Sequence, residues 1–252
     1  EGRWAGLYIA AIVLLTLFLS LLPAFMLDSI PAALLLLLPV SELVKSVLDF
    51  ILLHVTAPRR LPRMDTEKGL PPGGRTICVI SALLTDENAA ASMARRLELL
   101  RRCCKCGGVS FGLLADLPGA DRFEAEGDET ILSAARSAVN ALNRKYGGGF
   151  YLFTRPRSFD GECWTGRERK RGAITALARL LCDLSSELSV TGDRDALCGV
   201  NYILTLDSDT WVYPGSVEEL IGAALHPLNR PVFDEKRRVV TRGHAIIHPR
   251  MD

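Results

Sequence analysis

The chain has 252 residues, of which 48% are hydrophobic, 23% charged and only 7% aromatic. These proportions exclude a disordered or fibrous protein, and the length accommodates one large or two modest domains. The formal net charge is +1, from 30 basic and 29 acidic residues, so no global field points to a nucleic-acid partner. Any binding site must therefore be inferred from local residue patterns.

The first apolar segment is long enough to cross a membrane. Residues 4–27 carry no charge. As a helix they would measure about 36 Å at roughly 1.5 Å per residue, which exceeds the roughly 30 Å hydrocarbon core of a bilayer. A cleaved signal peptide would have a shorter apolar stretch after a basic start. We therefore predict a spanning helix over about 4–27.

A second helix is predicted over about 30–55, and it completes a membrane segment over 1–57. Its first part is apolar but too short to span alone, whereas Glu42, Lys45 and Asp49 later recur at helical spacing as one polar stripe. Two interpretations stay open. The segment is a second spanning helix whose stripe faces a protein partner, or a short re-entrant piece followed by an interfacial helix.

A proline- and arginine-rich stretch at 58–75 is predicted to be a semi-rigid linker. Four prolines between 58 and 72 prevent the preceding helix from continuing. Arg59, Arg60 and Arg63 lie close to the membrane segment, and the positive-inside rule places such charges in the cytosol. We therefore predict a protein of the inner or cytoplasmic membrane whose soluble domain faces the cytosol.

The chain has seven cysteines, an odd number that cannot pair fully and that fits a reducing compartment. Cys103, Cys104 and Cys106 form the densest group, at the end of a predicted helix. No second Cys or His pair follows at zinc-site spacing. Free thiols are predicted here, with a metal site as the less favoured alternative.

From residue 76 onward, apolar β-branched runs alternate with amphipathic runs. The predicted strands are 76–81, 109–115, 150–153 and 201–206, and the predicted helices are 86–102, 129–146 and 172–188. Continuous apolar strands separated by helices of this length indicate a mainly parallel sheet with helices on both faces. Residues 76–252 are therefore predicted to form an α/β domain, truncated at its C-terminus.

Acidic residues follow two of these strands, where ligands bind in parallel sheets. Asp116 ends one strand, and Asp207-Ser208-Asp209 ends another. In an extended chain, Asp207 and Asp209 point to the same side and offer hard oxygen ligands to Mg²⁺ or Mn²⁺. Such an ion can neutralise a departing nucleotide diphosphate. The sequence has neither a dinucleotide-binding glycine motif nor a P-loop. We therefore predict that this pair of aspartates, through its metal ion, binds the diphosphate.

The Asp-x-Asp pair admits other interpretations. It is also typical of a turn with solvated acids. The run 206–210 further matches the start of a haloacid-dehalogenase-like phosphatase, in which Asp207 would be the nucleophile that forms an aspartyl phosphate. That motif opens its domain, whereas here several α/β units precede it. A third alternative is a non-catalytic membrane-anchored module. Trp211 and Tyr213, just beyond the motif, are predicted either to stack on a sugar ring or to pack in the core.

The segment 164–172 is basic and leads into a predicted helix. It is either a solvated loop or a cationic rim where a helix start meets a diphosphate. We favour the rim, with Lys170 as the main phosphate ligand and Arg169 as the second. Consecutive helical positions are about 100° apart, so Arg171 is predicted to lie at the surface or to pair with an acid.

These patterns together resemble the membrane glycosyltransferase module of the cyclic β-1,2-glucan synthases. The resemblance is carried by Leu61–Asp65, Lys68–Pro71, Ser81–Thr85, Gly112–Asp116, Glu168–Gly172, Tyr202–Thr210 and His226–Pro231. One departure is Arg167, which stands where the family is expected to have Trp.

The resemblance implies an incomplete GT-A-like domain of a processive, inverting glycosyltransferase that moves glucose from UDP-glucose to a growing β-1,2-glucan. Asp209 is then expected to be the main metal ligand, Asp207 to be shared between ribose and metal, and Asp116 to bind the base or ribose end of the nucleotide. The catalytic base and the acceptor site are expected after residue 252. The expected partners are UDP-glucose, the glucan acceptor, the lipid bilayer and the remaining domains of a longer chain.

Overall fold

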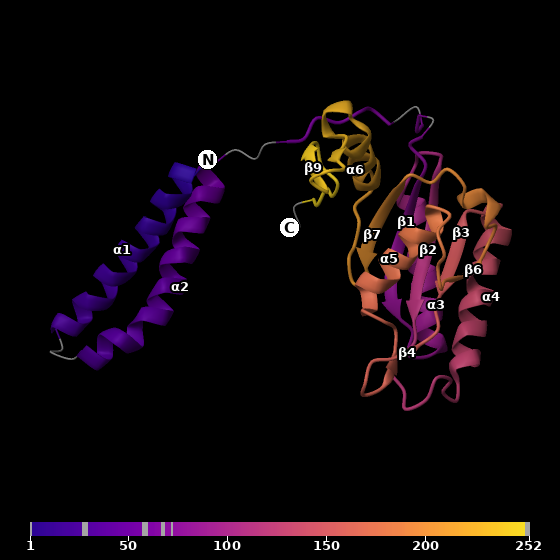
Figure 1. Ribbon diagram of the computed structural model, residues 1–252, viewed down its shortest axis with the longest axis horizontal. Coiled ribbons are helices and arrows are strands. Elements are labelled where there is room, and N and C mark those ends of the chain that lie inside the picture. Colours follow the sequence, from indigo (N-terminus) through magenta and orange to yellow (C-terminus); the bar gives the residue numbers. More distant parts are fainter. Residues whose placement is uncertain (1, 27–29, 57–59, 67–68, 72, 250–252) are drawn as a thin grey trace. The chain divides into compact units, whose positions relative to one another are not determined.

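A computed structural model describes residues 2–26, 30–56, 60–66, 69–71 and 73–249. The chain forms two compact units, Glu1–Arg60 and Leu61–Asp252, which we describe separately. Figure 1 shows a helical hairpin in the first unit and a sheet with helices in the second.

The first unit consists of α1 (Gly2–Met26) and α2 (Ile30–Val55), which pack side by side in opposite directions (Figure 1). The hydroxyl group of Tyr8 on α1 donates a hydrogen bond of 2.5 Å to Asp49 Oδ1 on α2. Lys45 lies 3.3 Å from the other Asp49 oxygen. Part of the polar stripe on the second segment therefore faces α1.

Within α1, Trp4–Pro23 is long and apolar enough to cross a membrane, as the sequence predicts. Among the described helices, this is the one that meets the criterion of length and composition. The second helix is continuous although it contains Pro39. Whether α2 spans a bilayer or lies on it stays a prediction.

A five-stranded sheet in the order β6-β3-β2-β1-β7 forms the centre of the second unit. The strands are β1 (Thr76–Leu83), β2 (Val109–Asp116), β3 (Phe150–Thr154), β6 (Ser189–Thr191) and β7 (Tyr202–Asp207). All neighbouring pairs are parallel except β3 and β6. The predicted mainly parallel sheet is confirmed.

Helices cover both faces of this sheet, because successive strand residues point to opposite sides. Leu113 of β2 belongs to the core under α3, α4 and α6, whereas Leu114 belongs to the core under α5. These helices are α3 (Glu87–Cys103), α4 (Asp128–Tyr146), α5 (Arg169–Leu181) and α6 (Ser216–Leu225). The smaller elements are β4 (Ser158–Phe159), β5 (Trp164–Thr165), β8 (Val232–Asp234), β9 (Val239–Arg242) and the 3₁₀ turns η1 (Asp195–Leu197) and η2 (Pro227–Asn229).

The helix predicted over 172–188 is shifted. It begins earlier, at Arg169, and ends at Leu181. Asp183 has a φ of +54°, which breaks the helix, and the Arg179 side chain donates a 2.8 Å hydrogen bond to the Ser185 carbonyl. Leu184, which lies inside the predicted helix but beyond the observed one, is exposed.

Part of the predicted linker packs against α6. The Met64 amide donates to the Gly222 carbonyl at 2.9 Å, and the Asn229 side chain donates to the Pro62 carbonyl at 2.8 Å. Arg63 pairs with Glu219 at 2.7 Å. A Cβ atom at Gly222 would lie 2.4 Å from the Met64 oxygen, so glycine permits this close approach.

A buried ion pair joins the start of α4 to the segment after β3. Arg157 Nη2 donates to Asp128 Oδ1 at 2.8 Å, and Arg157 Nη1 contacts the other carboxylate oxygen. The side chains are only 5% and 14% exposed, respectively. The hydrogen bonds from Arg157 lower the pKa of Asp128 below its usual value.

This pair predicts a pH-dependent contribution to stability. The pKa of Asp128 is lower in the folded chain than in the unfolded one, where it is about 3.9. The stabilisation from the ion pair is therefore fully present above about pH 5, and it is lost as the pH falls through the pKa that Asp128 has in the folded chain. Asp128→Asn should therefore reduce the free energy of unfolding by about 3 kcal/mol at neutral pH, and by much less at the most acidic pH that both proteins tolerate. Urea denaturation of both proteins across pH tests this. A difference that does not change with pH would contradict it.

Candidate functional site

Three neighbouring strands end at one edge of the sheet and bring polar side chains there. In the strand register, Ser81 of β1 lies opposite Asp207 of β7, and Leu83 of β1 lies opposite Asp116 of β2. Since β2 and β7 flank β1 on opposite sides, the strand order reverses here, and open α/β sheets bind ligands at such switch points. The predicted placement of Asp116 and Asp207 at one edge is confirmed.

A cavity of about 270 Å³ opens at this edge. Its lining includes Ser81, Asp116, Gly166, Arg169 and Lys170. A larger hollow, of about 430 Å³, lies over the first turns of α3 and α4 and is lined by Glu87 and Glu129 but by no basic residue. We take the smaller cavity as the candidate site, because it combines acidic and basic side chains at the switch point.

Arg155 binds two residues that line this cavity, Asp116 and Arg169, and the sequence analysis did not predict its role. Its side chain is 1% exposed. The guanidinium donates two hydrogen bonds of 2.7 Å to the two oxygens of Asp116. It also donates at 2.6 Å to each of the carbonyls of Arg167 and Arg169. One buried cation therefore ties the end of β2 to the start of α5.

The charge of Arg155 is maintained in this buried position. Burial alone would lower its pKa, but the hydrogen bonds and the negative charge of Asp116 outweigh burial and raise the pKa. Two glycines make room for the group. A Cβ atom at Gly166 would lie 2.8 Å from both Arg155 Nη2 and Asp116 Oδ2. One at Gly172 would lie 2.0 Å from the Arg167 carbonyl oxygen and 2.7 Å from Arg155 Nη1. A larger residue at either position would force the guanidinium or the groups that it binds to shift.

The basic segment forms the start of α5, as predicted. Glu168 and Arg169 have φ values of +52° and +44°, a strained conformation for residues other than glycine, of the kind that clusters at functional sites. Lys170 Nζ contacts Asp207 Oδ1 directly. Arg171 is 84% exposed and lies 3.7 Å from Glu168, which confirms its predicted surface position. Arg169 and Lys170 line the cavity, whereas Arg171 is not among the lining residues.

The backbone conformation of the Asp-x-Asp pair differs in part from the predicted one. Asp207 ends β7, but Ser208 and Asp209 form a turn in which the Thr210 amide donates to the Asp207 carbonyl at 3.1 Å. The assumption of an extended chain therefore fails beyond Asp207. Both carboxylates are exposed, and Asp209 makes no side-chain hydrogen bond or ion pair with the described residues. Its exposed oxygens fit the ligand preference of Mg²⁺ or Mn²⁺, while Asp207 is engaged by Lys170.

Two aromatic side chains stand exposed beyond this turn. Trp211 is 73% exposed and Tyr213 is 82% exposed, which excludes the core-packing alternative, whereas stacking on a sugar ring stays a prediction. The guanidinium carbon of Arg96 lies 4.5 Å from the centre of the Trp211 ring, and Arg96 Nη2 donates to the Thr210 carbonyl at 2.7 Å. Arg96 therefore supports this aromatic residue beside the Asp-x-Asp turn.

The fold and the site define an α/β protein with a mainly parallel sheet and a charged crevice at the strand ends, preceded along the chain by an apolar helix. The chain is related to the cyclic β-1,2-glucan synthases, as its motifs predict. It is 30% identical over 220 residues to the cyclic beta-(1,2)-glucan synthase NdvB of Rhizobium meliloti (strain 1021). The match covers 85% of this chain and 8% of that relative. No family model matches the chain.

Proposed function

We propose that this chain carries the donor site of a membrane-associated glycosyltransferase of the GT-A type, which moves glucose from UDP-glucose to a growing β-1,2-glucan. The observation that carries the proposal is the crevice at the switch point, where Asp116 and Asp207 flank β1 and Lys170 lies against Asp207. Similarity to a relative named as a glucan synthase supports the same conclusion.

Each side chain has a chemical role in this proposal. Asp116 accepts hydrogen bonds from the base or ribose of the nucleotide, since a carboxylate held by Arg155 keeps lone pairs for further donors. Lys170 donates to the diphosphate, assisted by Arg169. In the absence of donor, the pairing with Asp207 holds Lys170 at the strand edge, where the phosphate would bind.

A divalent cation completes the site. Asp209, with Asp207, would hold Mg²⁺ or Mn²⁺, which when bound neutralises the negative charge of the leaving diphosphate. The exposed Trp211 and Tyr213 offer faces on which a sugar ring can stack. An inverting transfer also requires a base that takes the proton of the acceptor hydroxyl, and we assign that role to none of the crevice residues.

A phosphatase remains the alternative of a different reaction class. It would hydrolyse small phosphate esters through an aspartyl phosphate on Asp207, whereas the proposed transferase releases UDP from UDP-glucose. The position of Asp207 on β7, after three earlier parallel strands, favours the transferase. A non-catalytic membrane module would carry out neither reaction. The apolar helix α1 supports membrane attachment, and we propose that the second unit faces the cytosol.

Substitution of Lys170 tests the donor site directly. Lys170→Ala should weaken UDP-glucose binding by about 10-fold or more, because a hydrogen bond to a charged group contributes about 1.5–3 kcal/mol. Arg171→Ala is the matched control, since Arg171 is the next basic residue but is 84% exposed and pairs with Glu168. Calorimetric titration of the intact protein with UDP-glucose and Mn²⁺ measures both. Equal affinity in wild type and the two variants would show that the segment is a solvated loop.

A further inference from the structure

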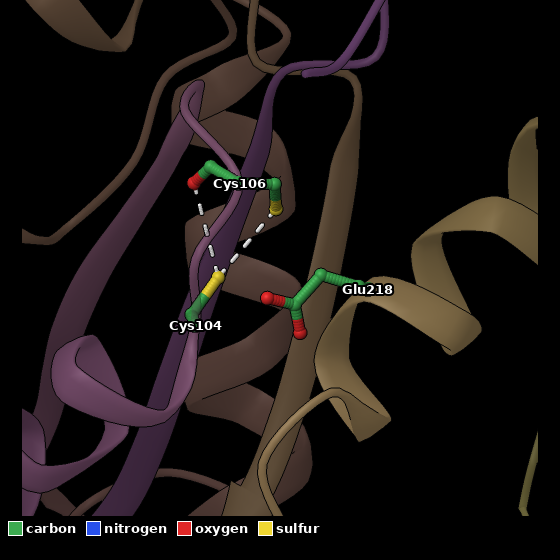
Figure 2. A group of neighbouring side chains, drawn as sticks. All are labelled: Cys104, Cys106 and Glu218. Atoms are coloured by element: carbon green, nitrogen blue, oxygen red, sulfur yellow. Dashed lines mark hydrogen bonds between the residues drawn. The ribbon is translucent and has the colours of Figure 1, made fainter. Parts of the chain in front are cut away.

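Three side chains from two distant parts of the sequence converge at the opposite edge of the sheet from the donor crevice. Cys104 follows α3, Cys106 lies in the turn before β2, and Glu218 lies in the first turn of α6 (Figure 2). The two sulfur atoms are 3.5 Å apart. The sulfurs and a carboxylate oxygen all lie within 4.8 Å of one another. Among the described residues, this is the one group of three or more side chains whose ligand atoms gather so closely.

The two cysteines of this cluster are buried, and one oxygen of Glu218 is buried without a partner among the described residues. Cys104 and Cys106 are 1% and 8% exposed, respectively. Glu218 Oε1 accepts a 2.5 Å hydrogen bond from the Lys105 amide, which fixes the carboxylate beside the sulfurs. Its Oε2 atom is buried and makes no hydrogen bond within the described part of the chain. A buried carboxylate oxygen without a donor is costly, so this atom indicates that a cation belongs beside it.

We propose that Cys104, Cys106 and Glu218 bind a zinc ion. Two thiolates at about 2.3 Å from one tetrahedral zinc ion lie about 3.8 Å apart, close to the 3.5 Å between these sulfurs. A carboxylate oxygen binds zinc at about 2.0–2.2 Å, which the close grouping of the three ligand atoms permits. Thiolate ligands select zinc over Mg²⁺ or Mn²⁺, so this site is chemically distinct from the Asp-x-Asp pair.

The surroundings suit such an ion. Two thiolates and one carboxylate leave one net negative charge after zinc binds, and the guanidinium of Arg101, which donates to the Cys104 carbonyl at 3.2 Å, lies nearby to balance it. Three protein ligands leave a fourth coordination position, which water fills in four-coordinate zinc. The ion would fasten the turn between α3 and β2 to α6, the helix that also holds the segment 61–66.

Metal analysis of the purified intact protein tests this site. We expect one zinc ion per chain after expression in zinc-supplemented medium and dialysis. Glu218→Gln and Cys106→Ser should each weaken zinc binding by at least about 10–100-fold in competition with a chromogenic chelator, since loss of even a group that only supports a ligand has an effect of that size. Cys103→Ser is the matched control, because this neighbouring thiol lies outside the cluster.

A second readout keeps the test independent of folding. Titration with Co²⁺ alone should give strong thiolate-to-cobalt charge-transfer absorption in wild type and Cys103→Ser, and much weaker absorption in Cys106→Ser, which keeps one of the two sulfur ligands. Glu218→Gln preserves the size of the side chain and both thiols, and circular dichroism checks its fold. The proposal is overturned if the wild type binds no stoichiometric zinc, if Cys106→Ser binds zinc as tightly as the control, or if mass spectrometry of non-reduced protein finds a Cys104–Cys106 disulfide.

Discussion

Asp209→Asn is expected to lower glucose transfer by the intact protein by at least about 1000-fold, because a bound divalent cation contributes several kcal/mol and each 1.4 kcal/mol is a factor of ten in rate. Asp209 is exposed in the turn after β7 and unpaired among the described residues, so its carboxylate is available to a cation. The asparagine keeps the size of the side chain but removes the charge. Release of UDP from UDP-glucose, measured with Mn²⁺, provides the rate.

A control separates this effect from a general loss of acidic surface. Asp183 is also exposed, and its φ of +54° is one that asparagine tolerates, so Asp183→Asn should retain wild-type transfer. Transfer at the wild-type rate by Asp209→Asn would remove the metal assignment. Full activity of the wild type in excess chelator would remove it as well.

Arg155→Met is expected to reduce the free energy of unfolding by about 3–5 kcal/mol, because it leaves the carboxylate of Asp116 without its buried counter-ion. The carbonyls of Arg167 and Arg169 lose their donors in the same variant. Methionine fills a similar volume, so the effect reports lost charge and hydrogen bonds more than a cavity. Urea denaturation followed by circular dichroism measures it.

Two further variants make this test specific. Arg171→Met, at an 84% exposed position, should change stability by less than about 0.5 kcal/mol. The double variant Arg155→Met with Asp116→Asn should be more stable than the sum of the two single losses predicts, because removing both charges leaves neither one buried alone. A loss below about 1 kcal/mol in Arg155→Met would contradict the role of Arg155 as the centre of the site.

The elements with local signals were predictable from the sequence. The helix α3 begins where Asp86 caps it, with Asp86 Oδ1 accepting from the Ala89 amide at 2.7 Å, and α4 ends at Gly147, whose φ is +77°. Acidic N-caps and C-terminal glycines are visible in a sequence. The edge strand β6 and the hairpins β4–β5 and β8–β9 are too short for a periodic pattern, and they form through contacts with distant segments. The parallel strands were therefore predictable from the sequence, whereas the antiparallel edge strand and the two hairpins were not.

The same distinction applies to the site. Asp116 and Asp207 were predictable because each follows an apolar strand. Arg155 was not, because its importance lies in a contact with Asp116, which is 39 positions away. Glu218 was not predictable for the same reason, because it is 113 positions from Lys105, whose amide donates to its carboxylate beside the two sulfurs. Tertiary contacts between single residues leave no local pattern.

The most direct measurement is a cryo-electron microscopy structure of the intact protein with UDP and Mn²⁺. We expect the nucleotide in the cavity bordered by Ser81, Asp116 and Gly166, with its diphosphate beside Lys170 and the cation beside Asp209. A nucleotide bound instead in the acidic hollow over α3 and α4, or elsewhere on the protein with this crevice free of it, would contradict the assignment of the donor site.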